Sequence, residues 1–137
     1  MIITEGDGII LTPTYHVFDM FKDFQGATLL PLEVTGDQYR FGDQSMPAII
    51  AGTARLQDGR IKLALVNVDP HQAHDIAVPL PAGTITGEIL SGPQIASANS
   101  RSHPDTVAPR PFSGFRRGGQ DVTVQMPAKS IVVLTIG

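Results

Sequence analysis

The side chains best suited to catalysis are the three glutamates of the chain, Glu5, Glu33 and Glu88. Two carboxylates held roughly 5 to 9 Å apart can cleave a glycosidic bond, one as the acid and the other as base or nucleophile. Each of these glutamates is flanked by residues typical of a turn or of a strand surface. The chain also has no cysteine and no Gly-x-Ser-x-Gly sequence around a serine nucleophile. We therefore expect no catalytic residue here.

Two histidines, His71 and His74, lie next to Asp69 and Asp75, and all four side-chain types can bind a metal ion. They follow a predicted strand on a turn, and their spacing fixes no third ligand. Cysteine, the other common zinc ligand, is absent. Plain surface residues are the better interpretation of this cluster, so we expect neither a metal nor a cofactor.

Sugar-binding modules stack pyranose rings on exposed aromatic side chains, which makes each aromatic residue worth testing. The chain has no Trp, and Phe18, Phe21 and Phe24 recur at helical spacing, which favours packing in a core or an interface. Tyr39 and Phe41 alternate within a predicted loop. These two remain the candidates for a sugar platform.

A basic and aromatic stretch near the C-terminus contains Arg110, Arg116 and Arg117 together with Phe112 and Phe115. The chain as a whole has only 10 Lys and Arg residues among 137, and its net charge is -3. Such a charge balance does not attract nucleic acid. We expect the two rings to pack together beneath arginine side chains, and no nucleic-acid partner.

The N-terminal residues carry no basic segment, and their apolar run is too short for a signal peptide or a membrane span. We expect a cytoplasmic protein with no membrane partner.

Residues 2–4 and 9–11 are short apolar pieces that flank either a hairpin turn or a loop. At 137 residues the chain is long enough to bury the core of one domain.

Residues 61–69 and 131–136 organise the predicted fold. When the first stretch is taken alternately, apolar side chains occupy both of its faces, which is typical of a central strand covered on both sides. Around these stretches, shorter apolar runs are interrupted by Pro, Gly and Asp. That pattern indicates strands laid into two stacked antiparallel sheets. The sequence therefore predicts an all-β fold, a two-sheet antiparallel β-sandwich.

Turn residues divide the rest of the chain. Asp58 and Gly59 indicate a tight hairpin that joins a strand over residues 48–56 to the central strand. Further strands are expected over residues 27–34, 75–80 and 84–90.

Two segments, residues 36–47 and 91–111, are predicted loops. The second is long for a compact domain, so we expect it to wrap an edge of the sandwich or to serve a neighbour. Residues 121–127 and 130–136 are expected to form a closing pair of strands.

Residues 12–26 are predicted to form a helix. Thr12 can cap the free N–H groups of the first turn, Pro13 suits the first helical position, and Gly26 can end the helix. A sandwich of this size offers its apolar stripe no obvious partner, so something large must cover it. The stripe consists of Val17, Met20, Phe21 and Phe24, widened by Phe18.

Five stretches resemble, in the right order, the C-terminal part of the family fifty-one α-L-arabinofuranosidases, and together they extend over essentially the whole chain. No single stretch is diagnostic, whereas five in order are hard to obtain by chance. They are residues 11–22 (LTPTYHVFDMFK), 26–31 (GATLLP), 62–70 (KLALVNVDP), 103–112 (HPDTVAPRPF) and 127–134 (PAKSIVVL).

This resemblance implies a retaining glycosidase that removes terminal α-L-arabinofuranosyl groups from arabinoxylan, arabinan and related oligosaccharides. In such enzymes the two catalytic glutamates lie on a (β/α)8 barrel, and the C-terminal region forms a jelly-roll-type sandwich. Residues 1–26 would then be the last barrel strand and helix, and residues 27–137 the C-terminal domain. The family's sandwich also takes strand material from the N-terminus of the full chain, so this chain would leave a strand edge unpaired.

We therefore expect a jelly-roll-like sandwich with one N-terminal α-helix, which serves an arabinofuranosidase as an accessory domain and does not hydrolyse by itself. Its expected partner is the catalytic barrel. An arabinose-containing oligosaccharide would be an indirect partner, with Thr12, Tyr39 and Phe41 as candidate substrate-binding residues. Thr12 is included because some relatives place a polar residue of the sugar pocket close to this position. A free-standing carbohydrate-binding module is the alternative, and an independent enzyme a third possibility.

The uncovered helix stripe also has a consequence for assembly. Because apolar helix faces and strand edges invite association, we expect the chain to form a homo-oligomer or to fold the helix back and bury Phe18, Phe21 and Phe24.

Overall fold

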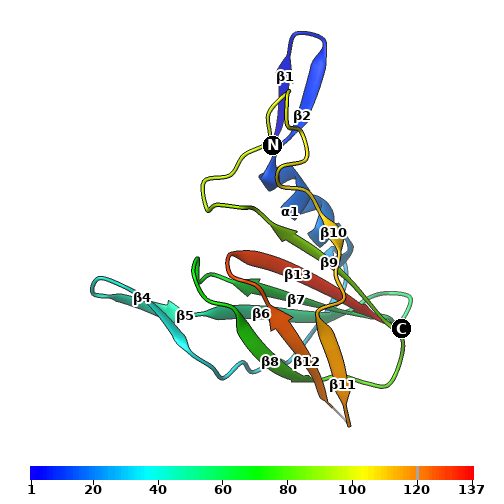
Figure 1. Cartoon of the computed structure of the whole chain (residues 1–137). Helices are drawn as coiled ribbons and strands as arrows, with labels where there is room; N and C mark the ends of the chain where they lie inside the picture. The colour runs from blue at the N-terminus through cyan, green and yellow to red at the C-terminus, as the bar shows by residue number, and fades with distance from the viewer. Residues whose placement is uncertain (120) are drawn as a thin grey trace.

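Antiparallel β-strands make up most of the molecule, which a computed structural model describes for residues 1–119 and 121–137 (Figure 1). Helix α1 (Pro13–Phe21) continues into a short 3-10 turn, Lys22–Phe24. The strands are β1 (Ile2–Glu5), β2 (Gly8–Leu11), β3 (Thr28–Leu30), β4 (Gln38–Phe41), β5 (Gln44–Pro47), β6 (Ile49–Arg55), β7 (Ile61–Asn67), β8 (His74–Pro79), β9 (Ile85–Ser91), β10 (Arg110–Pro111), β11 (Phe115–Gly118), β12 (Asp121–Met126) and β13 (Ser130–Ile136).

The larger sheet has six strands in the order β10-β9-β13-β7-β6-β3. Strands β7 and β13 lie at its centre and pair directly, with Leu63 opposite Leu134 and Leu65 opposite Val132. All four of these side chains are fully buried. The prediction of two central strands is therefore confirmed, and so is the Asp58-Gly59 hairpin that joins β6 to β7.

The smaller sheet has three strands in the order β11-β12-β8 and packs against one face of the larger sheet. Val122, Val124 and Met126 alternate along β12, point toward the larger sheet and are fully buried. They form one hydrophobic cluster with the inward-facing residues of β7 and β13. The predicted two-sheet antiparallel sandwich is confirmed.

Helix α1 begins as its sequence predicts, but its α-helical part ends at Phe21 and a 3-10 turn takes the chain toward Gly26. The Thr12 hydroxyl accepts a hydrogen bond from the Tyr15 N–H at 3.3 Å, and Pro13 opens the helix. Gly26 follows the 3-10 turn with a φ of 72°, a conformation that glycine adopts without the strain felt by other residues. In the described part of the chain, no helix is both long enough and apolar enough to cross a membrane.

The outer face of the larger sheet is the partner of α1, so the expectation that the sandwich offers this helix no partner is wrong. Met20 is buried against Ala64 and Val133, and the other stripe residues of the helix pack around it, except Phe18. The small side chain of Ala64 leaves room for the helix to lie close to the sheet. Phe18 is 63% exposed, so only part of the predicted stripe is covered.

Residues 36–47 contain a hairpin, and the prediction of a loop there is wrong. Strands β4 and β5 pair with Tyr39 opposite Met46, and Gly42 turns the chain with a φ of 58°. The turn carries Gly-Asp, the reverse of the usual Asp-Gly signal, and the strands are short and largely polar. Figure 1 shows that this hairpin projects away from the sandwich.

Two strand assignments also differ from the predictions. The strand expected over residues 27–34 is limited to β3, since Pro31 next in sequence lacks a donor for the ladder. Strands β12 and β13 do not pair with each other, because the link between them passes from the smaller sheet to the larger one. Lys129 bends this link with a φ of 48°.

The segment between β9 and β10 remains a loop, as predicted, and it ties the β1–β2 hairpin to the sandwich. Buried Asn99 donates from Nδ2 to the Leu11 carbonyl at 2.8 Å. Arg101 reaches the hairpin tip, where it donates to the Glu5 carbonyl at 3.0 Å and pairs with Asp7 at 2.7 Å. The loop therefore holds the N-terminal hairpin at both its base and its tip.

Candidate functional site

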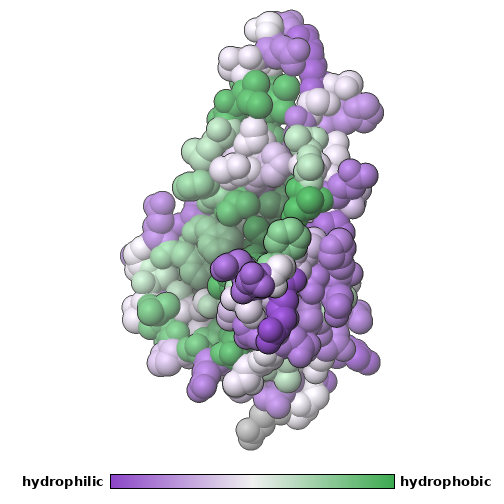
Figure 2. Space-filling model, turned by 90° about the vertical axis from the view of Figure 1, so that its left-hand side faces the viewer, coloured by the Kyte–Doolittle hydropathy of each residue, from purple (hydrophilic) through white to green (hydrophobic). Residues whose placement is uncertain are grey.

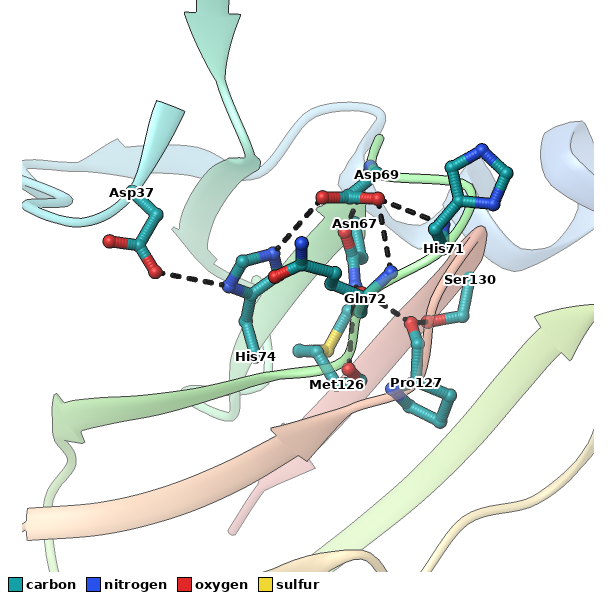
Figure 3. A network of polar contacts seen from close by, with 9 residues as sticks. All are labelled: Asp37, Asn67, Asp69, His71, Gln72, His74, Met126, Pro127 and Ser130. Atoms are coloured by element: carbon teal, nitrogen blue, oxygen red, sulfur yellow. Dashed lines mark hydrogen bonds and ion pairs between the residues drawn. The ribbon is translucent and has the colours of Figure 1, made fainter. Parts of the chain in front are cut away.

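A network of polar contacts surrounds the turn at which β7 leaves the larger sheet (Figure 3). The buried Asn67 amide ends β7 and donates from Nδ2 to the carbonyls of Gln72 and Pro127, each at 2.9 Å. Its Oδ1 accepts from the Asp69 N–H at 3.0 Å, and Ser130 donates to the same Pro127 carbonyl at 2.6 Å. Since buried polar atoms require partners, this network fixes the turn against the link between the sheets.

Asp69 is the buried charged group of this turn. Its Oδ1 accepts from the N–H groups of His71 at 2.8 Å and Gln72 at 3.0 Å. The hydrogen bond from His71 is the largest cause that lowers the pKa of Asp69 below its ordinary value, whereas burial acts in the opposite direction. The carboxylate is therefore ionised at neutral pH and held by backbone donors.

His74 lies between two carboxylates. Its Nε2 is 3.7 Å from Oδ2 of Asp69, and its Nδ1 is 3.5 Å from Oδ2 of Asp37. The His74 side chain is only 11% exposed, so its interpretation as a plain surface residue is wrong, whereas His71 is exposed and its ring points away (Figure 3). Within residues 1–119 and 121–137, no three His, Asp or Glu side chains are arranged to hold a metal ion.

The three glutamates lie on different elements and are all exposed. Glu5 ends β1 at the tip of the N-terminal hairpin, Glu33 lies in the segment after β3, and Glu88 lies in β9. Hydrolysis of a glycoside needs two carboxyl groups on either side of one bond. Their placement on three separate elements does not present such a pair.

Tyr39 and Phe41 lie on the same face of the β4–β5 hairpin, because they alternate along β4. Phe41 is 77% exposed, and Met46 lies opposite the half-buried Tyr39 and is also exposed. The hairpin thus carries an apolar face with two aromatic rings. Stacking on a sugar ring needs aromatic surface of this kind.

Thr12 lies elsewhere, at the start of α1, and the structure does not bring it together with the β4–β5 hairpin (Figure 1). Its hydroxyl donates to the Met1 carbonyl at 2.5 Å and accepts from Tyr15 N–H. Its backbone N–H also donates to Met1 at 3.1 Å. Thr12 therefore closes the base of the β1–β2 hairpin as well as capping the helix.

A groove of about 700 Å³ runs along β8, the edge strand of the smaller sheet. Its other wall is the segment between β3 and β4, including Leu32 and Val34, while Leu65 and Ile76 contribute to its floor and side. Strand β8 pairs with β12 on one side, and no strand of the described residues pairs with its other side. The groove therefore follows a free strand edge.

The arginines and phenylalanines near the C-terminus form no separate site. The rings of Phe112 and Phe115 pack with centroids 6.2 Å apart, which confirms their predicted contact. Arg117 donates to the Pro81 carbonyl at 3.0 Å, while Arg116 is exposed on β11. These side chains support the smaller sheet.

Sequence reasoning missed the contacts that join distant segments, such as those of Asp37, His74 and Arg101. Asn67 carried a usable signal, because it is a polar residue on the inward-facing side of an apolar strand and precedes Asp69 by two residues. Such a residue must satisfy its amide inside the fold. Asp37 carried none, since its partner lies 37 residues further along the chain.

A family model and a relative of known activity both match this chain. The family model of the alpha-L-arabinofuranosidase C-terminal domain matches residues 1–130. An intracellular exo-alpha-L-arabinofuranosidase from Bacteroides ovatus is 36% identical over 140 residues, which cover 99% of this chain and 27% of that protein.

Solved structures share the fold over the whole chain. The GH51 arabinofuranosidase from Xanthomonas axonopodis pv. citri matches with a TM-score of 0.95 and 42% identity, covering 100% of this chain and 28% of that one. The thermostable GH51 alpha-L-arabinofuranosidase from Thermotoga petrophila RKU-1 has a TM-score of 0.82 at 21% identity, covering 99% and 31%. The chain thus spans less than a third of the length of these relatives. It belongs to the alpha-L-arabinofuranosidase C-terminal domain family.

Proposed function

We propose that this chain works as the C-terminal accessory domain of a longer α-L-arabinofuranosidase and braces a catalytic barrel encoded upstream of it. The proposal rests above all on the large apolar side chains that lie exposed on the outer surface of α1 and the larger sheet, Phe18, Leu29 and Ile50. In the whole enzyme, residues 1–26 would belong to the barrel as its last strand and helix, and residues 27–137 would form the sandwich. By itself, the chain would not hydrolyse arabinofuranosides.

Helix α1 supports this role because it carries an exposed apolar ring on the side away from the sheet. Met20 is buried against the sheet, whereas Phe18 is 63% exposed on the helix surface. A helix that is apolar on opposite sides is typical of one that lies between two layers. The larger sheet is one layer, and the barrel would be the other.

The outer face of the larger sheet continues this apolar surface. Ile50 shares that face with Ala64, because it pairs with Val66, and it is 47% exposed. Leu29 pairs with Ala54 on the same face and is 80% exposed. Figure 2 shows apolar side chains gathered in a band below the polar top of the molecule. Large apolar side chains exposed on one face in this way are typical of an interface.

The free edge of β8 supports the same proposal. An exposed strand edge pairs readily with another extended segment, and the groove of about 700 Å³ beside it gives such a segment room. We infer that a segment upstream of the barrel in the whole enzyme adds a strand here. The resemblance to the arabinofuranosidases implies this exchange of strand material.

A chimera tests the accessory role. The C-terminal region of the Xanthomonas enzyme would be replaced by this chain, and hydrolysis of an aryl α-L-arabinofuranoside would be measured. We expect the chimera to be active, the truncated enzyme to be inactive, and this chain alone to be inactive. A folded but inactive chimera would contradict the accessory role, and turnover by this chain alone would contradict its dependence on a barrel.

Substitutions on the apolar surface locate the contact. In the chimera, we expect Phe18→Ser and Leu29→Ser to lower the melting temperature, because each would place a hydroxyl against the barrel. Met46→Ser is the matched control, since Met46 is also exposed but lies on the projecting β4–β5 hairpin. An equal loss for all three variants would argue against a contact at α1.

Carbohydrate binding is the second candidate function, and the aromatic face of the β4–β5 hairpin favours it. Calorimetry of the chain with arabino-oligosaccharides would detect binding, and we expect Tyr39→Ala and Phe41→Ala to abolish it. Phe18→Ala, which removes an exposed ring elsewhere, should leave it unchanged. No heat of binding with the native chain would favour the accessory role alone.

The same uncovered surface bears on assembly and location. Without a barrel, the face carrying Phe18, Leu29 and Ile50 would associate with a second copy, giving a homo-oligomer whose mass sedimentation would report. For the whole enzyme we propose a cytoplasmic location, as the name of the Bacteroides relative says intracellular.

A further inference from the structure

His74 is a largely buried titratable side chain that the accessory role leaves unexplained. It opens β8 and lines the groove, and its buried Nε2 has no hydrogen-bond partner among the described residues. The nearest charged atoms are carboxylate oxygens on two different segments, Asp69 at 3.7 Å and Asp37 at 3.5 Å. One imidazole thus faces two acids.

The two acids differ in how firmly they are held. Asp69 is buried and fixed by backbone N–H groups, the strongest from His71, which lower its pKa. The Asp37 side chain is 82% exposed, and it has no such donors in the described part of the chain. Asp69 is therefore a fixed anchor, and Asp37 is a partner that can move.

Asp37 stands at the neck of the β4–β5 hairpin. Its carbonyl accepts from the Ala48 N–H at 2.9 Å, which closes the hairpin at its base. The Ala48 carbonyl in turn accepts from the Val68 N–H at 2.9 Å, next to Asp69. A contact that fixes the Asp37 side chain therefore also stabilises the hydrogen bond between Asp37 and Ala48 at the base of the hairpin.

The protonation state of His74 decides whether it can bind both acids. A neutral imidazole has one N–H and one lone pair, so it can donate to one carboxylate while its lone pair faces the other. An imidazolium donates from both nitrogens. We propose that His74 is a proton-dependent clamp, which joins the hairpin neck at Asp37 to the fixed turn at Asp69 when the imidazole is charged.

The surroundings of His74 favour this behaviour. Glu33 and Asp75 line the same groove and add negative charge. Met126, which pairs with His74 across the smaller sheet, is uncharged, and the His71 ring points away from His74 (Figure 3). The carboxylates nearest the ring, Asp37 and Asp69, would both attract an imidazolium. Histidines exchange this proton within the physiological range, so the hairpin is held more firmly as the pH falls.

Hydrogen exchange of the Ala48 amide tests the clamp in the 137-residue chain. We expect its protection, corrected for the intrinsic exchange rate, to be up to about fivefold greater at about pH 5.5 than at about pH 7.5, the range expected of an exposed ion pair. The NMR titration of the His74 ring and of the Ala48 amide should follow one proton. Equal protection at both pH values would overturn the proposal.

Three variants separate the clamp from other effects. His74→Gln removes the titrating group, and Asp37→Asn removes the exposed partner without disturbing the core; both should abolish the pH dependence. His71→Gln is the matched control, because His71 lies on the same turn but is exposed, and it should keep the dependence. Asp37 is exposed, so Asp37→Asn should leave the buried turn at Asp69 intact. If the pH dependence persists in Asp37→Asn, the proposal is overturned as well.

Discussion

The two faces of the larger sheet are built from alternate residues of the same strands, yet they have different surroundings. On the inner face, Leu63 and Leu134 are fully buried against the smaller sheet. On the outer face, Ala64 and Val133 are buried under α1, whereas Ile50 on the neighbouring strand is 47% exposed. Elements of this chain cover the inner face fully, whereas they cover only part of the outer face.

The two faces therefore have different roles: packing on the inner face stabilises the fold, and the outer face is available to a partner. The inner face joins the two sheets in one hydrophobic cluster, which includes large side chains from both. The outer face combines small residues under the helix with large apolar residues beyond it. A surface of that kind contributes its full stability only when a partner covers it.

Truncating the inner face should have the largest effect. Leu134→Ala removes a fully buried side chain between the sheets, and we expect a loss of about 2 to 5 kcal/mol in the free energy of unfolding. Urea denaturation followed by circular dichroism would measure it. The loss should be the same for this chain and for the chimera, since the site lies within the chain.

Ile50→Ala on the outer face is the matched comparison. In this chain alone we expect a change within about 0.5 kcal/mol, because the side chain is half exposed. In the chimera the loss should be larger, since the barrel would cover the site. Equal losses for Ile50→Ala in both proteins would mean that the outer face has no partner there.

Substitution of Asn67, at the polar end of the inner face, should have the next largest effect on stability. Asn67 lies on the same side of β7 as Leu63 and Leu65, and its loss would leave the Gln72 carbonyl without its donor and the Pro127 carbonyl with the Ser130 hydroxyl in place of two donors. We expect Asn67→Ala to cost about 1 to 3 kcal/mol in thermal or urea unfolding. Gln72→Ala should be neutral by comparison, since Gln72 contributes its backbone carbonyl and its side chain is exposed.

The inner face could be predicted from sequence because its signal is local. Alternation of apolar residues over 61–69 and 131–136 identified both central strands, and Asp58-Gly59 identified the hairpin beside them. Thr12 likewise marked the start of the helix. Each of these signals depends on residues a few positions apart, which the backbone geometry brings together directly.

The outer face and the polar contacts could not be predicted in this way. Which sheet receives β12 depends on where the chain crosses after Met126, and alternation is the same for either sheet. The seat of α1 on Ala64 and the approach of Asp37 to His74 depend on segments far apart in sequence. The β4–β5 hairpin was missed because its few apolar residues do not reveal a strand that lies outside the core.

Loss of the helix cap should have a moderate effect. Thr12→Ala removes both the acceptor for the Tyr15 N–H and the donor to Met1, so we expect a loss of about 1 kcal/mol in the free energy of unfolding. Thr12→Ser keeps the hydroxyl and is the control. If Thr12→Ser loses as much stability as Thr12→Ala, the Thr12 hydroxyl is not what joins helix α1 to the β1–β2 hairpin.

The smallest effect should come from the ion pair that holds the 3-10 turn on the outer face. Asp23 lies 2.7 Å from Lys62, whose hydrogen bond is the main cause that lowers the pKa of Asp23, followed by the charge of Lys62. A lowered folded-state pKa stabilises the fold above the unfolded value of about 4, and this contribution is lost as the pH falls through the folded value. Because the Asp23 side chain is 41% exposed, we expect Asp23→Asn to cost at most about 1 kcal/mol at neutral pH.

The pH dependence distinguishes this ion pair from simple packing. The stability difference between the native chain and Asp23→Asn should be constant above about pH 5, shrink below about pH 4, and decrease with added salt. Asp19→Asn, which breaks a fully solvated pair with Lys22 within the helix region, is the control and should change stability less. A difference that stays constant down to about pH 2 would show that Asp23 holds the turn by its shape rather than by its charge, so that apolar packing around Met20 joins the outer layer to the sheet.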